Sequence, residues 1–232
     1  MTQCQVIALP PQLTRIDATS RADHSYLEPA DCCEYLAQYR VGRGDADDLR
    51  RLVLDFKCRP ALAARSPACA RRKRQAAAII VSALRRSLTR GAVESATWVP
   101  VPPSRAIGDP DYDDRLRQAL AAAFGGYDLD LRLLLTQTQS MAPDHNARIR
   151  SGADWLYRRL QVDVAALRIR PLRSRIVLFD DLLVSGKHYQ CCRRRLREQL
   201  PHSPISGCFI ARRLLPLRWR AAPRTQRADY AK

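Results

Sequence analysis

The stretch Arg175-Ile-Val-Leu-Phe-Asp-Asp-Leu-Leu-Val-Ser-Gly-Lys-His188 decides the fold that this sequence predicts. The four apolar residues at 176–179 are too few for a buried helix and are typical of a strand covered on both faces of a parallel sheet. Asp180 and Asp181 follow at the carboxyl edge, where open α/β sheets bind ligands. After a short turn, apolar residues recur at spacings of three and four, which predicts an amphipathic helix over residues 188–200.

The turn that follows the two acids has the features of an anion site. Backbone N–H groups at the start of a helix are unpaired, and the helix dipole favours negative charge there. Lys187 adds a positive charge. A Walker A loop is excluded, because Asp181 stands where its first glycine is required and His188 stands where Ser or Thr is required. A Rossmann turn is excluded as well, because it needs three glycines and only Gly186 is present.

Residues 176–186 resemble the ribose 5-phosphate site of type I phosphoribosyltransferases. That signature has four apolar residues, two acids, two apolar residues and then small or hydroxylic residues around a glycine, and the chain matches it position by position. The resemblance implies that Asp180 and Asp181 face the ribose hydroxyls. It places the 5-phosphate at Leu183, Val184, Ser185, Gly186, Lys187 and His188. Val184 and His188 depart from the pattern, which has Thr at the first position and Ser or Thr at the second. The alternative is an ordinary acidic turn that caps a helix.

A second segment, Thr97-Trp-Val-Pro-Val-Pro-Pro-Ser-Arg105, predicts a short strand that ends at Pro102, because proline cannot donate a hydrogen bond to a neighbouring strand. In type I phosphoribosyltransferases the first core strand ends in such a turn, and the next loop binds diphosphate. The resemblance therefore implies a diphosphate site at Pro103, Ser104 and Arg105. The Val-Pro-Val-Pro strand is particularly similar to competence-associated, ComF-type members. The alternative is a proline-rich edge strand.

Residues 136–152 form a long polar segment, and such a loop in a compact domain is usually functional or mobile. In the family this loop closes over the reacting centre and brings basic residues to the diphosphate. The resemblance implies that role for Arg148 as a catalytic residue. Arg150, His145 and Asn146 are further candidates. Closure has a physical reason, because water would attack the glycosyl cation formed in the reaction.

Alternation of strands and helices predicts an α/β fold with a mostly parallel central sheet flanked by helices. The resemblance implies the type I phosphoribosyltransferase fold. Further strands are expected at residues 129–135 and 205–211. A helix is expected to open with the acidic residues at 109–114, which the dipole favours. Candidates to line the site are Asp113, Asp114 and Arg115 from that helix, with Arg212 and Arg213 after the last strand.

The region 1–95 is expected to be helical and to serve as a hood or a partner-binding part. Helices are predicted at residues 31–39 and 45–56, followed by a linker over residues 59–67. A third helix is predicted to start at the basic run Arg71-Arg-Lys-Arg74. Because that placement opposes the helix dipole, the run suggests either contact with nucleic acid or a solvated basic surface. Residues 96–215 are then the α/β core, and residues 216–232 are a basic tail.

Composition limits the partners and the compartment. The net charge of +17, from 40 Lys and Arg against 23 Asp and Glu, favours polyanionic partners, although an Arg-rich genome composition gives the same excess. Eight cysteines lack Cys-x-x-Cys spacing, so no zinc ribbon is expected. No apolar stretch approaches the roughly 20 residues of a membrane span, and no signal peptide is recognised. A cytoplasmic protein without a membrane partner is expected.

The resemblance implies transfer of a phosphoribosyl group from 5-phosphoribosyl 1-diphosphate to an unidentified acceptor. It implies Mg²⁺ bound through the diphosphate and the ribose, without direct protein ligands. Similar proteins accompany reverse-transcriptase-based antiphage systems (retrons). The alternative is therefore a defence effector or regulator that contacts nucleic acid, or a reverse transcriptase and its DNA. A sugar-phosphate-binding regulator without turnover is a third hypothesis. The ComF-type zinc module is replaced by helices, which disfavours DNA uptake, and a homo-oligomer stays open.

Overall fold

The computed structural model describes residues 9–40, 47–140 and 152–214. Within them a six-stranded sheet has the order β1-β2-β8-β7-β3-β4, and neighbouring strands run parallel except for β1 with β2. Its strands are β1 (Thr14–Arg15), β2 (Cys33–Arg40), β3 (Ala96–Pro100), β4 (Asp130–Leu131), β7 (Arg175–Leu183) and β8 (Ile205–Leu214). A separate antiparallel pair joins β5 (Leu135–Gln137) to β6 (Leu160–Val162). The predicted α/β class with a mostly parallel central sheet is confirmed.

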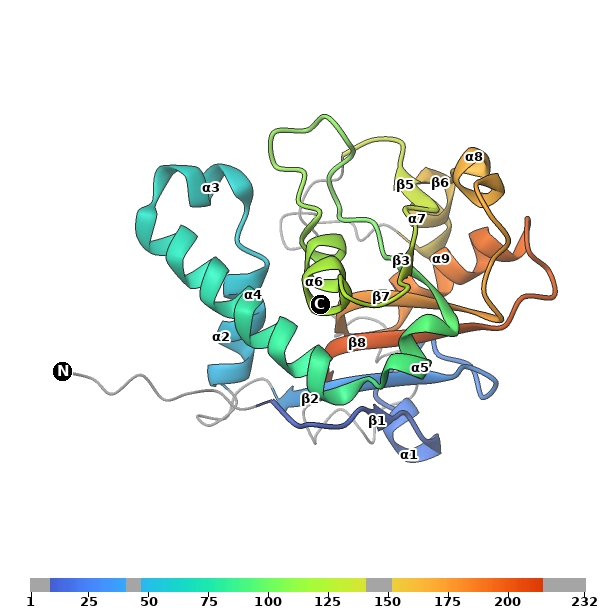
Figure 1. Ribbon diagram of the computed structural model, residues 1–232, viewed down its shortest axis with the longest axis horizontal. Coiled ribbons are helices and arrows are strands. Elements are labelled where there is room, and N and C mark those ends of the chain that lie inside the picture. The colour runs from blue at the N-terminus through green and yellow to red at the C-terminus, as the bar shows by residue number, and fades with distance from the viewer. Residues whose placement is uncertain (1–8, 41–46, 141–151, 215–232) are drawn as a thin grey trace.

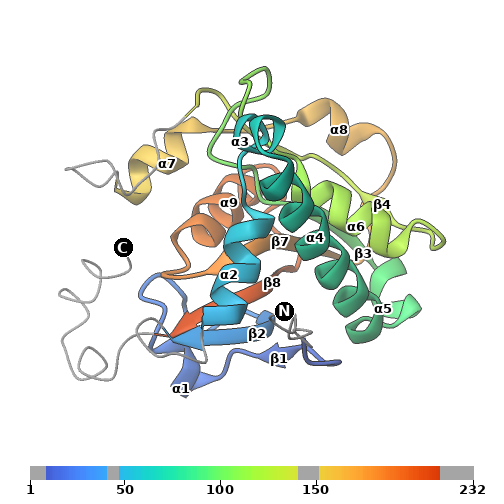
Figure 2. The ribbon, with the colours of Figure 1, turned by 90° about the vertical axis from the view of Figure 1, so that its left-hand side faces the viewer.

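Helices cover both faces of this sheet (Figures 1 and 2). One face is covered by α2 (Asp47–Phe56), α4 (Pro67–Ser87), α5 (Arg90–Glu94) and α6 (Arg115–Phe124). The other face is covered by α9 (Lys187–Arg197), and α7 (Ala153–Arg159) packs beside α9. The connections contain the short helices α1 (Ala18–Arg21), α3 (Pro60–Arg65) and α8 (Val164–Arg168).

Strand β7 lies at the centre of the sheet and serves both cores. Val177 and Phe179 pack in the cluster under α4 and α6, whereas Ile176 and Leu178 pack in the cluster under α9. Successive side chains of a strand point to opposite faces, so a run of four apolar residues fills two cores. Burial of each of these side chains stabilises the folded state by about 1.5–3 kcal/mol relative to leaving it exposed. The prediction of a strand covered on both faces is confirmed.

The helix predicted over residues 31–39 is wrong, because this segment is strand β2, parallel to β8. Cys33, Tyr35, Ala37 and Tyr39 are buried at every second position, with Glu34 and Gln38 exposed between them. That period of two fits a strand, but burial of Leu36 as well gave the segment a helical spacing. The region expected to be helical therefore also contributes strands to the sheet. None of the helices in the three described ranges is long and apolar enough to cross a membrane.

Prolines explain why a helix occupies the expected linker and why α4 begins earlier than predicted. The expected linker over residues 59–67 contains α3, which has Pro60 in its first turn, and α4 begins at Pro67 with Ser66 as its N-cap. Proline is favoured at the first helical position because the N–H there needs no helical partner. The basic run at residues 71–74 therefore lies inside α4 and not at its start.

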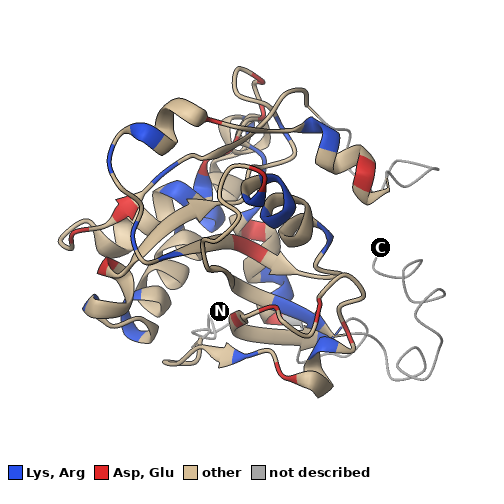
Figure 3. Cartoon of the chain, turned by 90° about the vertical axis from the view of Figure 1, so that its right-hand side faces the viewer, with Lys and Arg blue, Asp and Glu red and all other residues tan. Residues whose placement is uncertain are grey.

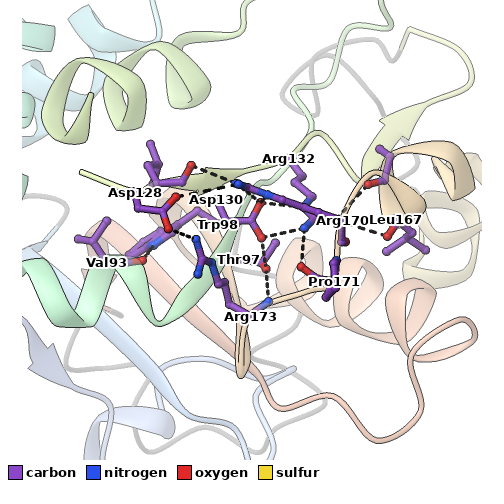
Figure 4. Close-up of polar contacts among 12 residues, drawn as sticks. Val93, Thr97, Trp98, Asp128, Asp130, Arg132, Leu167, Arg170, Pro171 and Arg173 are labelled. Carbon is purple, nitrogen blue, oxygen red and sulfur yellow. Dashed lines mark hydrogen bonds and ion pairs between the residues drawn. The ribbon is translucent and has the colours of Figure 1, made fainter. Parts of the chain in front are cut away.

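A buried ion pair interrupts the strand predicted over residues 129–135 (Figure 4). Only Asp130 and Leu131 pair with β3. The Nε of Arg132 then donates to Asp130 at 2.7 Å, and its guanidinium also donates to backbone carbonyls at positions 166, 167, 170 and 171. Because a buried charge requires a partner, this pair fixes the chain after β4 to the segment that leads into β7.

Candidate functional site

The order of the strands places the site outside the ends of β3 and β7. From β3 the chain continues through α6 to β4 on one side of the sheet, and from β7 it continues through α9 to β8 on the other side. Such a switch point leaves a crevice at the carboxyl ends of the two central strands, where open α/β sheets bind ligands. The segments that follow Pro100 and Phe179, which are register partners, therefore meet at one edge.

The acidic pair lies at this edge of the sheet but inside the strand. Asp180 and Asp181 belong to β7, which continues to Leu183 because β8 runs beside it to Arg212. The prediction that the strand ends before the acids is therefore wrong by four residues. Both acids are buried, with 8% and 2% of their surface exposed.

Asp181 is held by two basic side chains from other elements. Lys57 Nζ lies 2.8 Å from its Oδ1, and Arg115 donates to its Oδ2 through Nε at 3.1 Å and also through Nη2. Burial alone raises the pKa of Asp181, but the charges of Lys57 and Arg115 outweigh that effect and hold its pKa well below the usual range. Asp181 is therefore a charged, enclosed carboxylate.

Asp180 is in a different electrostatic state from its neighbour. Its Oδ1 accepts the N–H of Asp181 at 2.8 Å, and it forms no ion pair with any residue in the described ranges. Burial and the charge of Asp181 raise the pKa of Asp180 to about 7, against the smaller opposing effects of Lys57 and Arg115. Asp180 can therefore accept or donate a hydrogen bond near neutral pH.

The turn after β7 requires its glycine. Gly186 has φ +83°, a left-handed conformation that an L side chain rarely adopts, and an added Cβ would lie 2.8 Å from Cδ2 of Leu27. The eleven-residue helix α9 starts at the next residue, Lys187, whose N–H donates to Ser185 Oγ at 3.3 Å. A strand, a turn and a helix thus follow each other as predicted, although the helix ends at Arg197.

The loop after β3 contains the residues expected to bind diphosphate. The strand ends at Pro100, and Val101 adds one further hydrogen bond to the Phe179 carbonyl at 2.8 Å. Ser104 is exposed. Arg105 is directed to Asp109, with 3.6 Å between its Nη1 and the carboxylate.

Arg115 connects this loop to the acids. It lines a cavity at the end of β3 together with Pro103, Arg105, Asp113, Asp114, Tyr112 and Gln137, while its guanidinium contacts Asp181. Asp180 and Asp181 do not line that cavity. The helix expected from residue 109 begins only at Arg115. Asp113 accepts hydrogen bonds from Lys73 and from the N–H of Arg115, and Asp114 accepts one from Arg117, so these two residues do not continue the helix.

Several candidates lie away from the site or beyond the described ranges. Arg148, Arg150, His145 and Asn146 fall in residues 141–151, and the basic tail falls in residues 215–232, all outside the described residues. Arg212 is buried against β2, where its Nε donates to Gln38 at 2.8 Å and its guanidinium lies 4.8 Å from the Tyr35 ring centroid. It therefore packs inside the fold.

Two contributors to the site escaped the sequence argument, Lys57 and His24. Both come from the region before residue 95, and each meets β7 or its turn across more than a hundred residues. No local pattern marks either residue, because their contacts depend on tertiary packing. Comparisons of the chain with protein-family models, with curated proteins and with solved structures found no match.

Proposed function

We propose that this protein binds 5-phosphoribosyl 1-diphosphate with Mg²⁺ and transfers the phosphoribosyl group to an acceptor, in the manner of type I phosphoribosyltransferases and with their fold. One observation carries the proposal. At the switch point of the sheet, an acidic pair in β7 is followed by a turn with Gly186 in a left-handed conformation, at the start of α9. An acid that can meet hydroxyl groups and N–H groups that can meet an anion then follow each other within a few residues of the chain.

The reaction needs charge stabilisation more than acid or base catalysis. The bond between the anomeric carbon and a diphosphate oxygen breaks, the carbon becomes cationic, and the acceptor forms the new bond. Stabilisation of the departing diphosphate is then the main contribution of the protein. Arg105 and Arg115 line the cavity beside the β3 loop, as does Arg117, and the first two are proposed for that role together with Arg148.

The two acids are proposed to have separate tasks. Asp180, which has no ion pair among the described residues, would meet the ribose hydroxyls. Asp181 would hold Lys57 and Arg115 in place and keep the site compact. The turn formed by residues 183–188 would receive the 5-phosphate through backbone N–H groups and Lys187.

The donor set suits Mg²⁺ that is held mainly by the ligand. Mg²⁺ usually binds through one or two carboxylates and substrate phosphates, and Asp180 offers one carboxylate. In the described part of the chain no three His, Cys, Asp or Glu side chains converge as a metal site. Bound with the ligand, Mg²⁺ would neutralise charge on the leaving diphosphate.

Calorimetric titration with 5-phosphoribosyl 1-diphosphate and Mg²⁺ tests the proposal. We expect the parent to bind, and Asp180→Asn to bind at least about tenfold more weakly, a loss of roughly 1.4 kcal/mol. Asp128→Asn is the matched control, because Asp128 is 61% exposed and pairs with Arg173 away from the turn. Release of diphosphate then scores turnover. A parent that binds no ligand would remove the proposal.

A second candidate, a nucleic-acid-associated effector or regulator, is favoured by basic and aromatic residues of α7 and α9, and Figure 3 marks the basic positions along the chain in blue. The guanidinium carbons of Arg194 and Arg195 each lie 4.1 Å from the Tyr157 ring centroid, and that of Arg159 lies 4.0 Å from the ring of Trp155. Trp155 is 38% exposed. Basic groups interleaved with aromatic rings suit single-stranded nucleic acid, whose bases stack and whose phosphates bind cations.

The basic run in α4 supports this candidate less than the charge of +17 suggests. Lys73 pairs with Asp113 at 2.6 Å, and Arg72 pairs with Asp55 at 3.2 Å. A mobility shift with short single-stranded DNA tests the second candidate. We expect Trp155→Ala to weaken binding, Arg90→Ala on α5 to leave it unchanged, and affinity to fall steeply between about 50 and 200 mM salt. No shift, or no response to salt, would contradict it.

A further inference from the structure

We propose that His24 is a positioning residue, which orients the turn after β7 so that its N–H groups face the ligand. The inference rests on the proposed function, because it assigns a role toward the 5-phosphate. Its starting point is a contact across 160 residues, in which Nδ1 of His24 lies 2.5 Å from the carbonyl oxygen of Val184. No local sequence pattern brings these two groups together.

The chemistry of this contact defines the state of the histidine ring. A carbonyl oxygen only accepts, so Nδ1 carries the hydrogen and donates it to Val184. The ring is completely buried, and burial lowers the pKa of His24 to about 4, so the imidazole is neutral at ordinary pH. Nε2 is then an unprotonated acceptor, and it has no hydrogen-bond partner among the described residues. Within the described ranges, the ring thus bonds to the turn and to nothing else.

The neighbouring backbone makes a second contact with the same turn. The N–H of Tyr26 donates to the carbonyl oxygen of Ser185 at 2.9 Å. The side chain of Leu27 covers Gly186, where an added Cβ would come within 2.8 Å of it. Three residues from one short segment therefore hold three consecutive residues of the turn.

Peptide geometry converts these contacts into directions for the N–H groups. In a trans peptide, the carbonyl of one residue and the N–H of the next lie in one plane and point in opposite directions. No described peptide bond is cis. When the carbonyl of Val184 is fixed toward His24, the N–H of Ser185 must point away from it. When the carbonyl of Ser185 is fixed toward Tyr26, the N–H of Gly186 must point away as well.

The segment therefore occupies the carbonyl side of the turn and leaves the N–H side for an anion. Two adjacent N–H groups with a common direction form a concave anion site, and the start of α9 adds its dipole. Without the donor of His24 the peptide plane after Val184 would be free to rotate. The affinity of the turn for a phosphate would then fall, although no residue that touches the phosphate had changed.

A matched pair of variants tests the role of the donor. His24→Asn keeps an N–H donor close to the position of Nδ1, whereas His24→Leu has a similar size and no donor. The ligands are ribose 5-phosphate and, separately, diphosphate with Mg²⁺, titrated calorimetrically. We expect the Leu variant to bind ribose 5-phosphate about tenfold more weakly than the parent, equivalent to roughly 1.4 kcal/mol, and the Asn variant to recover most of that loss. Diphosphate affinity should be the same in all three proteins.

Amide hydrogen exchange adds a measurement that needs no ligand, with faster exchange expected in the Leu variant at Tyr26, whose N–H donates to the carbonyl oxygen of Ser185 in the held turn. If that variant does not fold, His24→Gln replaces it, because its amide extends one carbon farther and cannot donate from the Nδ1 position. A folded Leu variant with the parent's affinity for ribose 5-phosphate would overturn the inference alone. A parent that binds neither ligand would overturn the inference and the proposed function together.

Discussion

The side-chain nitrogen of Lys57 lies 2.8 Å from Oδ1 of Asp181, although 124 residues separate them in the sequence. Lys57 directly follows α2, and Asp181 lies in the central strand β7. The ion pair therefore ties the helices of the N-terminal region to the strand that carries the acidic pair. With Arg115 on its other oxygen, the side chain of Asp181 is only 3% exposed, which leaves Asp180 as the acid proposed to meet a ligand.

Lys57 and Arg115 are the two partners of Asp181, and replacing one should destabilise the fold more than replacing the other. We expect Arg115→Met to lower the free energy of unfolding by about 3 kcal/mol, because it weakens the pairing of a buried charge. Lys57→Met should cost about 1 kcal/mol, since the Lys57 side chain is 38% exposed. Urea unfolding measures both. Arg72→Met is the control, because its pair with Asp55 is more exposed, and equal losses in all three variants would contradict the expectation.

The left-handed glycine of the turn should resist substitution. We expect Gly186→Ala to cost about 1–2 kcal/mol of unfolding free energy, because an L residue is strained at φ +83°. The double variant with Leu27→Ala should relieve the contact with the new Cβ but not the backbone strain. Gly91→Ala in α5 is the control, since nothing lies within 4 Å of the added Cβ, and it should stabilise by about 0.5–1 kcal/mol. Equal effects at both glycines would contradict this account.

The raised pKa of Asp180 predicts a dependence of stability on pH. Its pKa is about 7 in the folded protein and 3.8 when unperturbed, so the folded state binds more protons between these values. The contribution of Asp180 to stability is therefore present below about pH 4 and is lost as the pH rises through 7, with a slope of at most about 1.4 kcal/mol per pH unit. Asp180→Asn should be more stable than the parent near pH 8, and this advantage should disappear toward pH 4.

His24 acts in the opposite direction, so the comparison must be made between variants. Its pKa is about 4 in the folded protein and 6.5 when unperturbed, and its contribution is present above pH 6.5 and is lost as the pH falls toward 4. The difference between parent and Asp180→Asn cancels this effect. Urea unfolding over the pH range checks the prediction, and a difference that does not vary with pH would contradict it.

Among the arginines that contact Asp130, replacement of the buried Arg132 should destabilise the fold more than replacement of Arg170 (Figure 4). We expect Arg132→Met to lower the unfolding free energy by about 3–5 kcal/mol, because it removes the buried cation that pairs with Asp130 and donates to several backbone carbonyls. Arg170→Met should cost about 1 kcal/mol, since the Arg170 side chain is 44% exposed although it also contacts Asp130. Unfolding in urea measures both losses. Similar losses of unfolding free energy in the two variants would contradict the expectation that the loss depends on how deeply the arginine is buried.

Sequence reasoning found the features that are encoded locally. The apolar run before Asp180 predicts β7, the prolines at 102 and 103 predict the end of β3 to within two residues, and the apolar spacing after Gly186 predicts α9. Each of these elements depends on a pattern within about a dozen residues, because the spacing of apolar residues follows the period of a strand or a helix. Because these patterns are local, the parallel sheet and the position of the turn after β7 could both be predicted from the sequence.

The features that sequence reasoning missed depend on partners far away in the chain. Burial of Leu36 beside Ala37 made the spacing in β2 helical as well as alternating, and only pairing with β8 decides between them. The extension of β7 past Asp181 depends on the length of β8 in the same way. Lys57 gave no local signal at all, because a lysine after a helix is usually a solvated charge.

The account depends most directly on where a sugar phosphate contacts the chain. The decisive measurement is the change in backbone amide chemical shifts when ribose 5-phosphate is added to the isotopically labelled protein. We predict that the largest changes occur at Ser185, Gly186, Lys187 and His188, with smaller ones at Asp180. Saturable changes confined to other parts of the chain, or no changes at all, would contradict the claim that this turn binds the phosphate.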